Sequence, residues 1–301
     1  MRFADEYVRQ VALLVNIFPI VSKFPNFALK GGSAINLFYQ NLPRLSVDID
    51  LVYLPLEARD AAIENINSSL ERMKSALESN GFRASVVGAM NSRKIYCSNE
   101  ETTIKIEPNY TIRGTLHSVS LLDVVPKVRD RFGFAKTNVL AFDELYAGKL
   151  CAALDRQHPR DLFDVNKLYE MHSSLPEELI QCFVVYLLGH NRPVHELLDC
   201  EIQNRLETFE GEFVGMTDEH CNYAEMLQTL LRLKNDLKMR LEPYKNFISS
   251  FLALQANFSD FVIPDIQNLP AIQWKLRNLE TLRKTNVRKF EMQMKKFEEC
   301  F

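Results

Sequence analysis

Several features that would assign this chain to other classes of protein are missing from its 301 residues. The longest apolar runs, such as residues 183–188, fall far short of the roughly 20 residues that a membrane-spanning helix needs. No charged and then apolar leader opens the chain. The six cysteines show no C-x-x-C spacing and no histidine pattern lies beside them, which argues against a zinc site and indicates reduced thiols. We therefore expect a cytoplasmic protein with no membrane segment.

A strong excess of one charge is also missing. The formal net charge of -3 argues against a broad nucleic-acid-binding surface, because binding to phosphate backbones relies on clustered Lys and Arg. Two local clusters are nevertheless basic. One comprises Lys127, Arg129, Arg131 and Lys136, and the other Lys275, Arg277, Arg283, Lys284, Arg288, Lys289, Lys295 and Lys296. Lysine-rich helix faces are usually only solvated, so the sequence leaves open whether the C-terminal cluster contacts RNA.

The most informative run is Gly31-Gly32-Ser33 followed by Asp48-Ile49-Asp50. Side chains alternate between the two faces of a strand, so Asp48 and Asp50 are expected to project together while Ile49 faces a core. Two carboxylates on one face suit a hard divalent cation such as Mg²⁺. A pair of such ions roughly 3.5–4 Å apart can hold the attacking and leaving oxygens of a phosphoryl displacement.

The glycine pair supplies the second half of this interpretation. Gly31 and Gly32 leave the backbone unobstructed, and Ser33 is a good N-cap for a helix beginning at Ala34. Such a helix start offers N–H groups and a positive end to a triphosphate. Taken alone, Gly-Gly-Ser is commonly an ordinary turn and Asp-x-Asp a solvated strand edge. Their combination, in this order, favours nucleotide transfer.

These motifs resemble the nucleotidyltransferase superfamily and, more narrowly, the AbiEii toxin family, the toxin half of type IV toxin–antitoxin pairs. The matching blocks are residues 30–34, 44–51, 144–150 and 160–165, and they fall between Lys30 and Val165, a span of about half of the chain. It implies an NTP substrate, Mg²⁺ or Mn²⁺ as cofactor, and an antitoxin encoded by the adjacent gene. The implied acceptor is the 3′ end of tRNA, with arrest of translation and growth as the effect.

The resemblance also implies roles for two residues in the later blocks. Lys149 and Asp161 match residues that are essential to the active site of related toxins, and a lysine there would contact a triphosphate oxygen. Asp161 and Asp164 are expected to share a helix face near Lys149. The alternative is a surface ion-pair ladder among Lys149, Arg156, Arg160 and Asp161.

Two further site residues follow from the family pattern. In the family, a third carboxylate usually comes from a neighbouring strand. Glu107 is the candidate, because alternation places it on one face of its strand and Ile104 and Ile106 on the other face. The superfamily more often has Asp there, and a half-buried strand with a solvated face is the alternative. Ser46 lies beside the aspartate pair, at a position implicated in regulatory phosphorylation in similar toxins, although most serines before a strand are simply turn residues.

The order of elements predicts an α/β (α+β) protein, with a mixed-sheet nucleotidyltransferase-like domain over residues 1–142 and an all-helical domain over 143–301. Strands are expected at residues 27–30, 47–53, 83–87, 94–97, 102–107 and 116–119. Helices are expected at 6–21, where Pro19 ends or kinks the helix, and at 58–79, 143–156, 160–170, 176–188, 194–209, 218–241, 245–255 and 272–297. The site is then expected at the seam of the two domains.

Three functions agree with the sequence. The first is transfer of a nucleoside monophosphate to tRNA, with Asp48, Asp50 and Glu107 on the metal, Gly31, Gly32 and Ser33 at the triphosphate, and Lys149 offsetting phosphate charge. The second is the same transfer onto a protein side chain. The third is a non-catalytic protein that binds a partner or a nucleotide.

Overall fold

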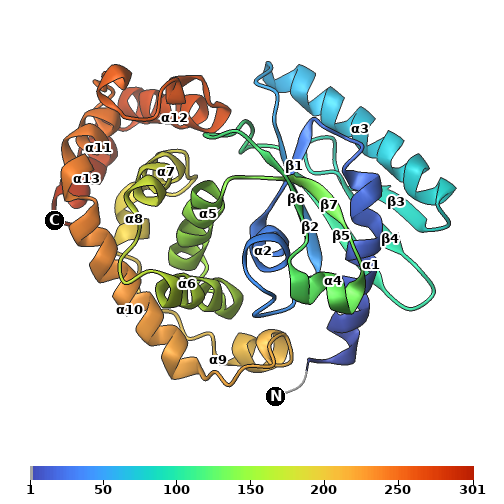
Figure 1. Cartoon of the computed structure of the whole chain (residues 1–301). Helices are drawn as coiled ribbons and strands as arrows, with labels where there is room; N and C mark the ends of the chain where they lie inside the picture. Colours follow the sequence, from blue (N-terminus) through green and yellow to red (C-terminus); the bar gives the residue numbers. More distant parts are fainter. Residues whose placement is uncertain (1–2) are drawn as a thin grey trace. The chain divides into compact units, whose positions relative to one another are not determined.

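The computed structural model describes residues 3–301. Its N-terminal part is built around a seven-stranded mixed sheet (Figure 1). The strands are β1 (Phe27–Lys30), β2 (Asp48–Tyr53), β3 (Arg83–Val87), β4 (Lys94–Ser98), β5 (Thr103–Asn109), β6 (Ser120–Asp123) and β7 (Lys136–Val139). Their order is β3-β4-β5-β2-β1-β7-β6. β2 is parallel to β5 and β1 to β7, and the other neighbours are antiparallel. The expected α/β fold with a mixed sheet is confirmed.

Helices α1 (Asp5–Val21) and α3 (Arg59–Ser79) contact each other and pack along this sheet, as Figure 1 shows. Pro19 does not end α1, which continues to Val21, the predicted last residue of this helix. Ser22 N–H still donates to Phe18 O at 2.8 Å, so the proline removes only its own donor from the last turn. The short helix α4 (Pro126–Phe132) and strand β7 were not predicted, and the strand expected at 116–119 forms instead as β6.

From Phe142 on, the regular elements of the chain are all helices. Its helices are α5 (Phe142–Asp155), α6 (Pro159–Met171), α7 (Glu177–Leu188), α8 (Val194–Leu198), α9 (Leu206–Thr208), α10 (Tyr223–Arg240), α11 (Lys245–Leu252), α12 (Pro270–Thr285) and α13 (Val287–Glu298). Two expected helices are broken. The one at 194–209 stops at Leu198 and resumes only as α9, and the one at 272–297 divides at Asn286, whose side chain caps α13 by accepting from Lys289 N–H at 3.0 Å.

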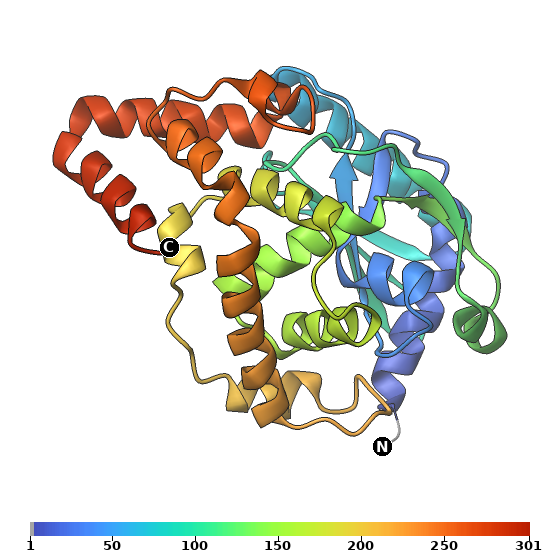
Figure 2. The same ribbon diagram turned by 60° about the vertical axis from the view of Figure 1, so that its left-hand side comes forward.

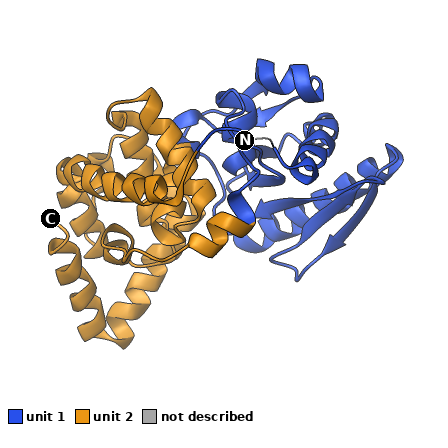
Figure 3. Cartoon of the chain, turned by 90° about the horizontal axis from the view of Figure 1, so that it is seen from below, with its two compact units in different colours: residues 1–145, 212–220 blue, residues 146–211, 221–301 orange. Residues whose placement is uncertain are grey.

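The chain divides into two compact units (Figure 3). Unit 1 runs to Leu145 and includes Glu212–His220, and unit 2 comprises Tyr146–Gly211 and Cys221–Phe301. The segment Glu212–His220 is tied into unit 1 by backbone bonds, among them Leu45 N–H to Met216 O at 2.6 Å. Unit 1 is therefore discontinuous in sequence. The division into two domains between residues 142 and 143 stays a prediction.

Candidate active site

Strands β2 and β5 place three carboxylates of unit 1 on one face of the sheet. In their parallel register Asp50 lies opposite Glu107, and Asp48 lies opposite Lys105. Asp48 and Asp50 are partly exposed, whereas the intervening Ile49 is fully buried. The alternation expected from the sequence is therefore present, and it brings Glu107 to the two aspartates.

Lys105 stands on the same face and already contacts one of the acids. Its ammonium lies 2.7 Å from Glu107 Oε2. Burial acts to lower the pKa of Lys105, but the hydrogen bond with Glu107 and the charges of the two aspartates outweigh burial and raise that pKa above its ordinary value. Lys105 thus balances part of the negative charge of this face.

The donor set fits a hard divalent cation in chemistry, because carboxylate oxygens are the ligands that such ions prefer. Within the described residues no three side chains of His, Cys, Asp or Glu are yet gathered around one point as metal ligands. The strand presents Asp48 and Asp50 on this face, and their role as metal ligands stays a prediction. The role of Glu107, which is turned to Lys105, stays a prediction.

The glycine turn abuts the acidic face. Gly31 has φ +74°, in the left-handed region that favours glycine, and a Cβ built there would collide with Oδ2 of Asp50. A side chain at residue 31 would therefore occupy the space directly beside the carboxylate. The backbone of the turn can approach the acids because glycine adopts this positive φ and has no Cβ to collide with Asp50.

Ser33 fastens this turn to β2, although it does so differently from the expectation. Its hydroxyl donates to Asp48 O at 2.5 Å and lies 3.1 Å from Ser46 Oγ. The helix α2 (Gly31–Ala34) begins three residues earlier than predicted, with Lys30 at the N-cap position, and continues as a π-helical segment, Ile35–Tyr39. The prediction that Ser33 is the N-cap is therefore wrong, because the glycines themselves form the first helical positions.

Arg44 is a buried residue of this site that the motif reading did not single out. Its guanidinium donates to Leu45 O at 2.9 Å, and a Cβ on Gly32 would lie 2.7 Å from Arg44 Nη2 and 2.8 Å from Ser46 Oγ. Gly32 thus makes room for both side chains. The signal was present in the sequence, since Arg44 opens the family block 44–51. Ser46 is only 9% exposed, so its phosphorylation, which stays a prediction, requires the turn to open.

A polar cavity of about 290 Å³ opens beside the acids, lined by Lys30, Asp50 and Glu107 and by residues at and beyond the end of β5. Its size is near the lower limit for small-molecule sites. Among its lining residues, Tyr110 donates its hydroxyl to Asn67 Oδ1 at 2.8 Å, which holds the ring in place. The cavity gives unit 1 a space in which a ligand can contact Asp50.

In unit 2, Lys149 on α5 is enclosed by two carboxylates of α6. Its Nζ lies 2.7 Å from Asp161 Oδ1 and 2.9 Å from Asp164 Oδ2. The side chain of Lys149 is 6% exposed and those of the aspartates 1%. The expected shared face of Asp161 and Asp164 is therefore present.

Arg156 completes this cluster from its edge, with Nε 2.6 Å from Asp161 Oδ2 and a side chain that is 60% exposed. Burial acts to raise the pKa of Asp161, but Lys149 and Arg156 outweigh burial and hold that pKa well below its ordinary range. A surface ladder does not describe this arrangement, because Lys149 and Asp161 are buried. Arg160 contributes differently, since its backbone N–H donates to the capping His158 ring at 3.1 Å.

Comparison with known proteins decides the family. The model of the nucleotidyl transferase AbiEii toxin of type IV toxin–antitoxin systems matches residues 12–278, most of the chain. This chain belongs to the AbiEii toxin family. Its fold is similar to that of MenT4, a nucleotidyltransferase toxin from Mycobacterium tuberculosis H37Rv, with a TM-score of 0.59, 16% identity, and coverage of 84% of this chain and 94% of that one. A search of curated proteins found no match.

Membership in the AbiEii family makes the chain a nucleotidyltransferase of a type IV toxin–antitoxin system, with an NTP as substrate, a divalent metal in general terms, and an antitoxin as partner. Within residues 3–301, no helix of this AbiEii protein is both long and apolar enough to cross a bilayer.

Proposed function

We propose that this AbiEii protein transfers a nucleoside monophosphate from an NTP to the 3′ end of tRNA in the cytoplasm, and so blocks translation and growth until its cognate antitoxin neutralises it. The observation that carries the site is the collision that a Cβ on Gly31 would make with the Asp50 carboxylate. The short distance supports the proposal, because the turn expected to bind the triphosphate then adjoins the acids expected to bind the metal within one unit. The acceptor and the antitoxin's origin in the adjacent gene rest on family resemblance.

In the proposed reaction, the acceptor hydroxyl attacks the α-phosphorus of the NTP. A bond forms from that oxygen to phosphorus, the α–β bridging P–O bond breaks, and pyrophosphate leaves. Asp48 and Asp50 would hold Mg²⁺ or Mn²⁺, which when bound would supply positive charge at the triphosphate. Glu107 would complete the metal site and accept the proton of the hydroxyl.

The remaining site residues bind and position. The backbone N–H groups of Gly31, Gly32 and Ser33 would face phosphate oxygens, because the first N–H groups of a helix have no partner within it. Ser46 supports this turn from beside Ser33. Lys149 would offset phosphate charge in the transition state, and Asp161 would position its ammonium, a role that their 2.7 Å ion pair supports.

The test is label transfer. Purified protein is incubated with Mg²⁺, each α-labelled NTP in turn, total RNA and cell protein, and the products are resolved on gels. We expect label in a tRNA-sized band from the wild type and none from Asp48→Asn. Asp60→Asn, at a side chain that is 97% exposed, is the matched control and should transfer normally. Label confined to protein would move the acceptor to a side chain, and no label from folded protein would refute transfer.

A further inference from the structure

The two basic clusters of the sequence differ in their partners. In unit 1, the cations of residues 127–136 are each engaged. Lys127, Arg129 and Lys136 lie 3.7, 3.8 and 3.4 Å from aspartate oxygens. Arg131 lies over the rings of Phe3 and Phe132, 4.9 and 5.5 Å from their centroids. Their charge is therefore partly satisfied within the unit.

The turn between α12 and α13 in unit 2 presents a different arrangement. Arg283 and Lys284 lie in the last turn of α12, Arg288 and Lys289 in the first turn of α13, and all four are exposed. We call these four residues the basic corner, and Figure 2 shows the two helices meeting there, in red. In the part of the chain that the structure describes, none of the four forms an ion pair with a carboxylate.

The faces of α13 show what this corner can bind. Phe290 and Phe297 are the buried residues of α13, and at 100° per residue Arg288 projects from nearly the opposite side of the helix. The buried face is engaged within unit 2, where the ring of Phe297 contacts Phe301 at 5.2 Å. A basic helix that lies on a bilayer must insert its apolar face, and here that face is already covered. The exposed surface of α13 carries Arg288 and Lys289 together with Glu291 and two apolar side chains, Val287 and Met292.

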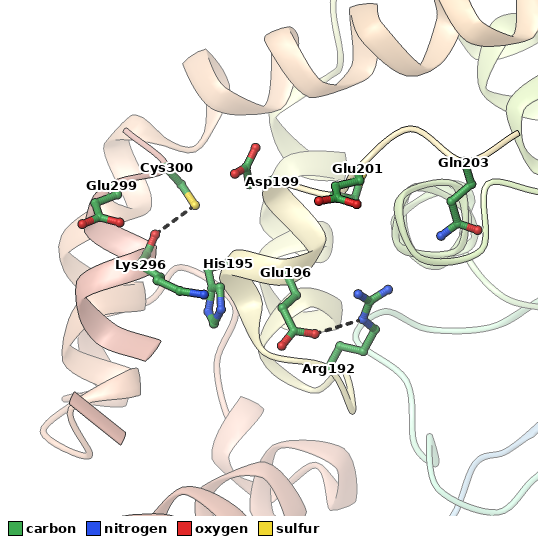
Figure 4. A pocket seen from close by; sticks show the side chains of 10 residues that line it. Arg192, His195, Glu196, Asp199, Glu201, Gln203, Lys296, Glu299 and Cys300 are labelled. Atoms are coloured by element: carbon green, nitrogen blue, oxygen red, sulfur yellow. Dashed lines mark hydrogen bonds and ion pairs between the residues drawn. The ribbon is translucent and has the colours of Figure 1, made fainter. Parts of the chain in front are cut away.

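The lysines farther along α13 are engaged otherwise. Lys295 lies 3.8 Å from Glu299. Lys296 lines a cavity of about 470 Å³ together with His195 and four carboxylates, and Figure 4 shows its side chain directed toward His195. The cavity is mixed in charge and suits no anion. Apart from Lys296, the exposed cations of the C-terminal cluster that form no ion pair within the described residues are therefore Arg277 and the four residues of the corner.

We propose that the basic corner binds backbone phosphates of the acceptor RNA. This inference rests on the proposed function for the identity of the RNA. Exposed cations with no internal partner are the groups that release counterions when they neutralise phosphates. With a net charge of -3 over the whole chain, the rest of the surface repels RNA on average, so binding should depend steeply on these few cations.

The experiment measures binding without transfer. Full-length Asp48→Asn protein is titrated into fluorescein-labelled tRNA, and anisotropy gives Kd at several KCl concentrations from about 50 to 200 mM. The test variant changes the four corner residues to Gln. The matched control removes four exposed cations scattered elsewhere, Arg9, Arg59, Arg83 and Lys238, also by Gln. Circular dichroism checks that both remain folded.

We expect the corner variant to bind at least tenfold more weakly than the control at low salt. Its slope of log K against log salt should fall by about 3, because each lost phosphate contact removes about 0.7–0.9. Equal affinities and slopes in the two variants would overturn the proposal, as would RNA binding that is intact while binding to the antitoxin or to anionic vesicles is lost. Corner-dependent binding without label transfer by the wild type would refute the proposed function and leave RNA binding standing.

Discussion

Replacing Lys149 with methionine removes the ammonium from between Asp161 and Asp164 while keeping a side chain of similar length. The two carboxylates are almost fully buried, so they cannot recover hydration without opening the packing of α5 on α6. Asp161 keeps its bond to Arg156 at 2.6 Å, but Asp164 loses its contact at 2.9 Å. The variant therefore holds one excess buried negative charge.

Removing one member of a buried ion pair costs about 3–5 kcal/mol. We place Lys149→Met near the lower end, about 3 kcal/mol, because Arg156 remains. Arg156→Gln is the matched control. Its side chain is 60% exposed and screened by solvent, so its loss should stay within about 1 kcal/mol.

The loss should also depend on pH. The pKa of Asp161 is held below its ordinary value of 3.8, so its contribution to stability is complete above about pH 5 and is lost as the pH falls through the acid range. The difference between wild type and Lys149→Met should therefore be largest near neutral pH and shrink toward pH 3.

Urea unfolding provides the assay. The only tryptophan, Trp274, lies on α12 in the same unit as Lys149, so its fluorescence reports on unit 2, and circular dichroism follows both units. A loss below about 1 kcal/mol for Lys149→Met would refute the reasoning about the buried cluster. The double variant Lys149→Met/Asp164→Leu restores charge balance and should recover most of the stability. If it also recovers transfer, Lys149 is structural; if transfer stays absent, Lys149 acts in the reaction.

Three further predictions follow from single contacts. Gly31→Ala should abolish transfer and cost about 1–2 kcal/mol, because it places a Cβ at φ +74° against Asp50, whereas Gly211→Ala, with open space at its Cβ, should do neither in the same label-transfer and urea assays. Ser33→Ala should cost about 1–2 kcal/mol by removing a buried hydroxyl bond and should weaken NTP binding, and an unchanged Kd in isothermal titration would contradict this. Burial lowers the pKa of Lys275 to about 8, so the unfolded chain binds more protons than the folded chain between pH 8 and 10.5. The free energy of unfolding should therefore rise across that window by up to about 3 kcal/mol in the wild type but not in Lys275→Met. Urea melts at several pH values measure this difference.

Alternation alone was enough to predict the acidic face. Period-two patterning fixed the direction of Asp48 and Asp50, and the same rule placed Glu107 correctly once β5 paired with β2. Alternation did not predict that Glu107 pairs with Lys105, which is two residues away on the same face of the same strand. This ion pair competes with metal binding by Glu107. Whether Glu107 is a ligand remains a prediction.

The sequence pattern did not predict where long amphipathic segments break into separate helices. Residues 272–297 keep helical periodicity throughout, and only the capping ability of Asn286 marks the corner between α12 and α13. A single capping residue is a weak signal within a continuous pattern. Likewise, Ser33 has the right chemistry for an N-cap, but its hydroxyl donates to Asp48 O instead. Local propensity does not encode such a long-range contact.

The return of Glu212–His220 to unit 1 bears on how the toxin is made. Leu45, which leads into the strand of Asp48 and Asp50, has its N–H bonded to Met216 O, and Ala4 N–H is bonded to Gly215 O. During synthesis these bonds cannot form until residue 216 has left the ribosome, whereas N-terminal regions otherwise tend to fold first. A nascent or truncated chain that ends before residue 212 therefore lacks these backbone bonds beside its acidic strand, which ties the assembly of the candidate active site to the synthesis of residues 212–220.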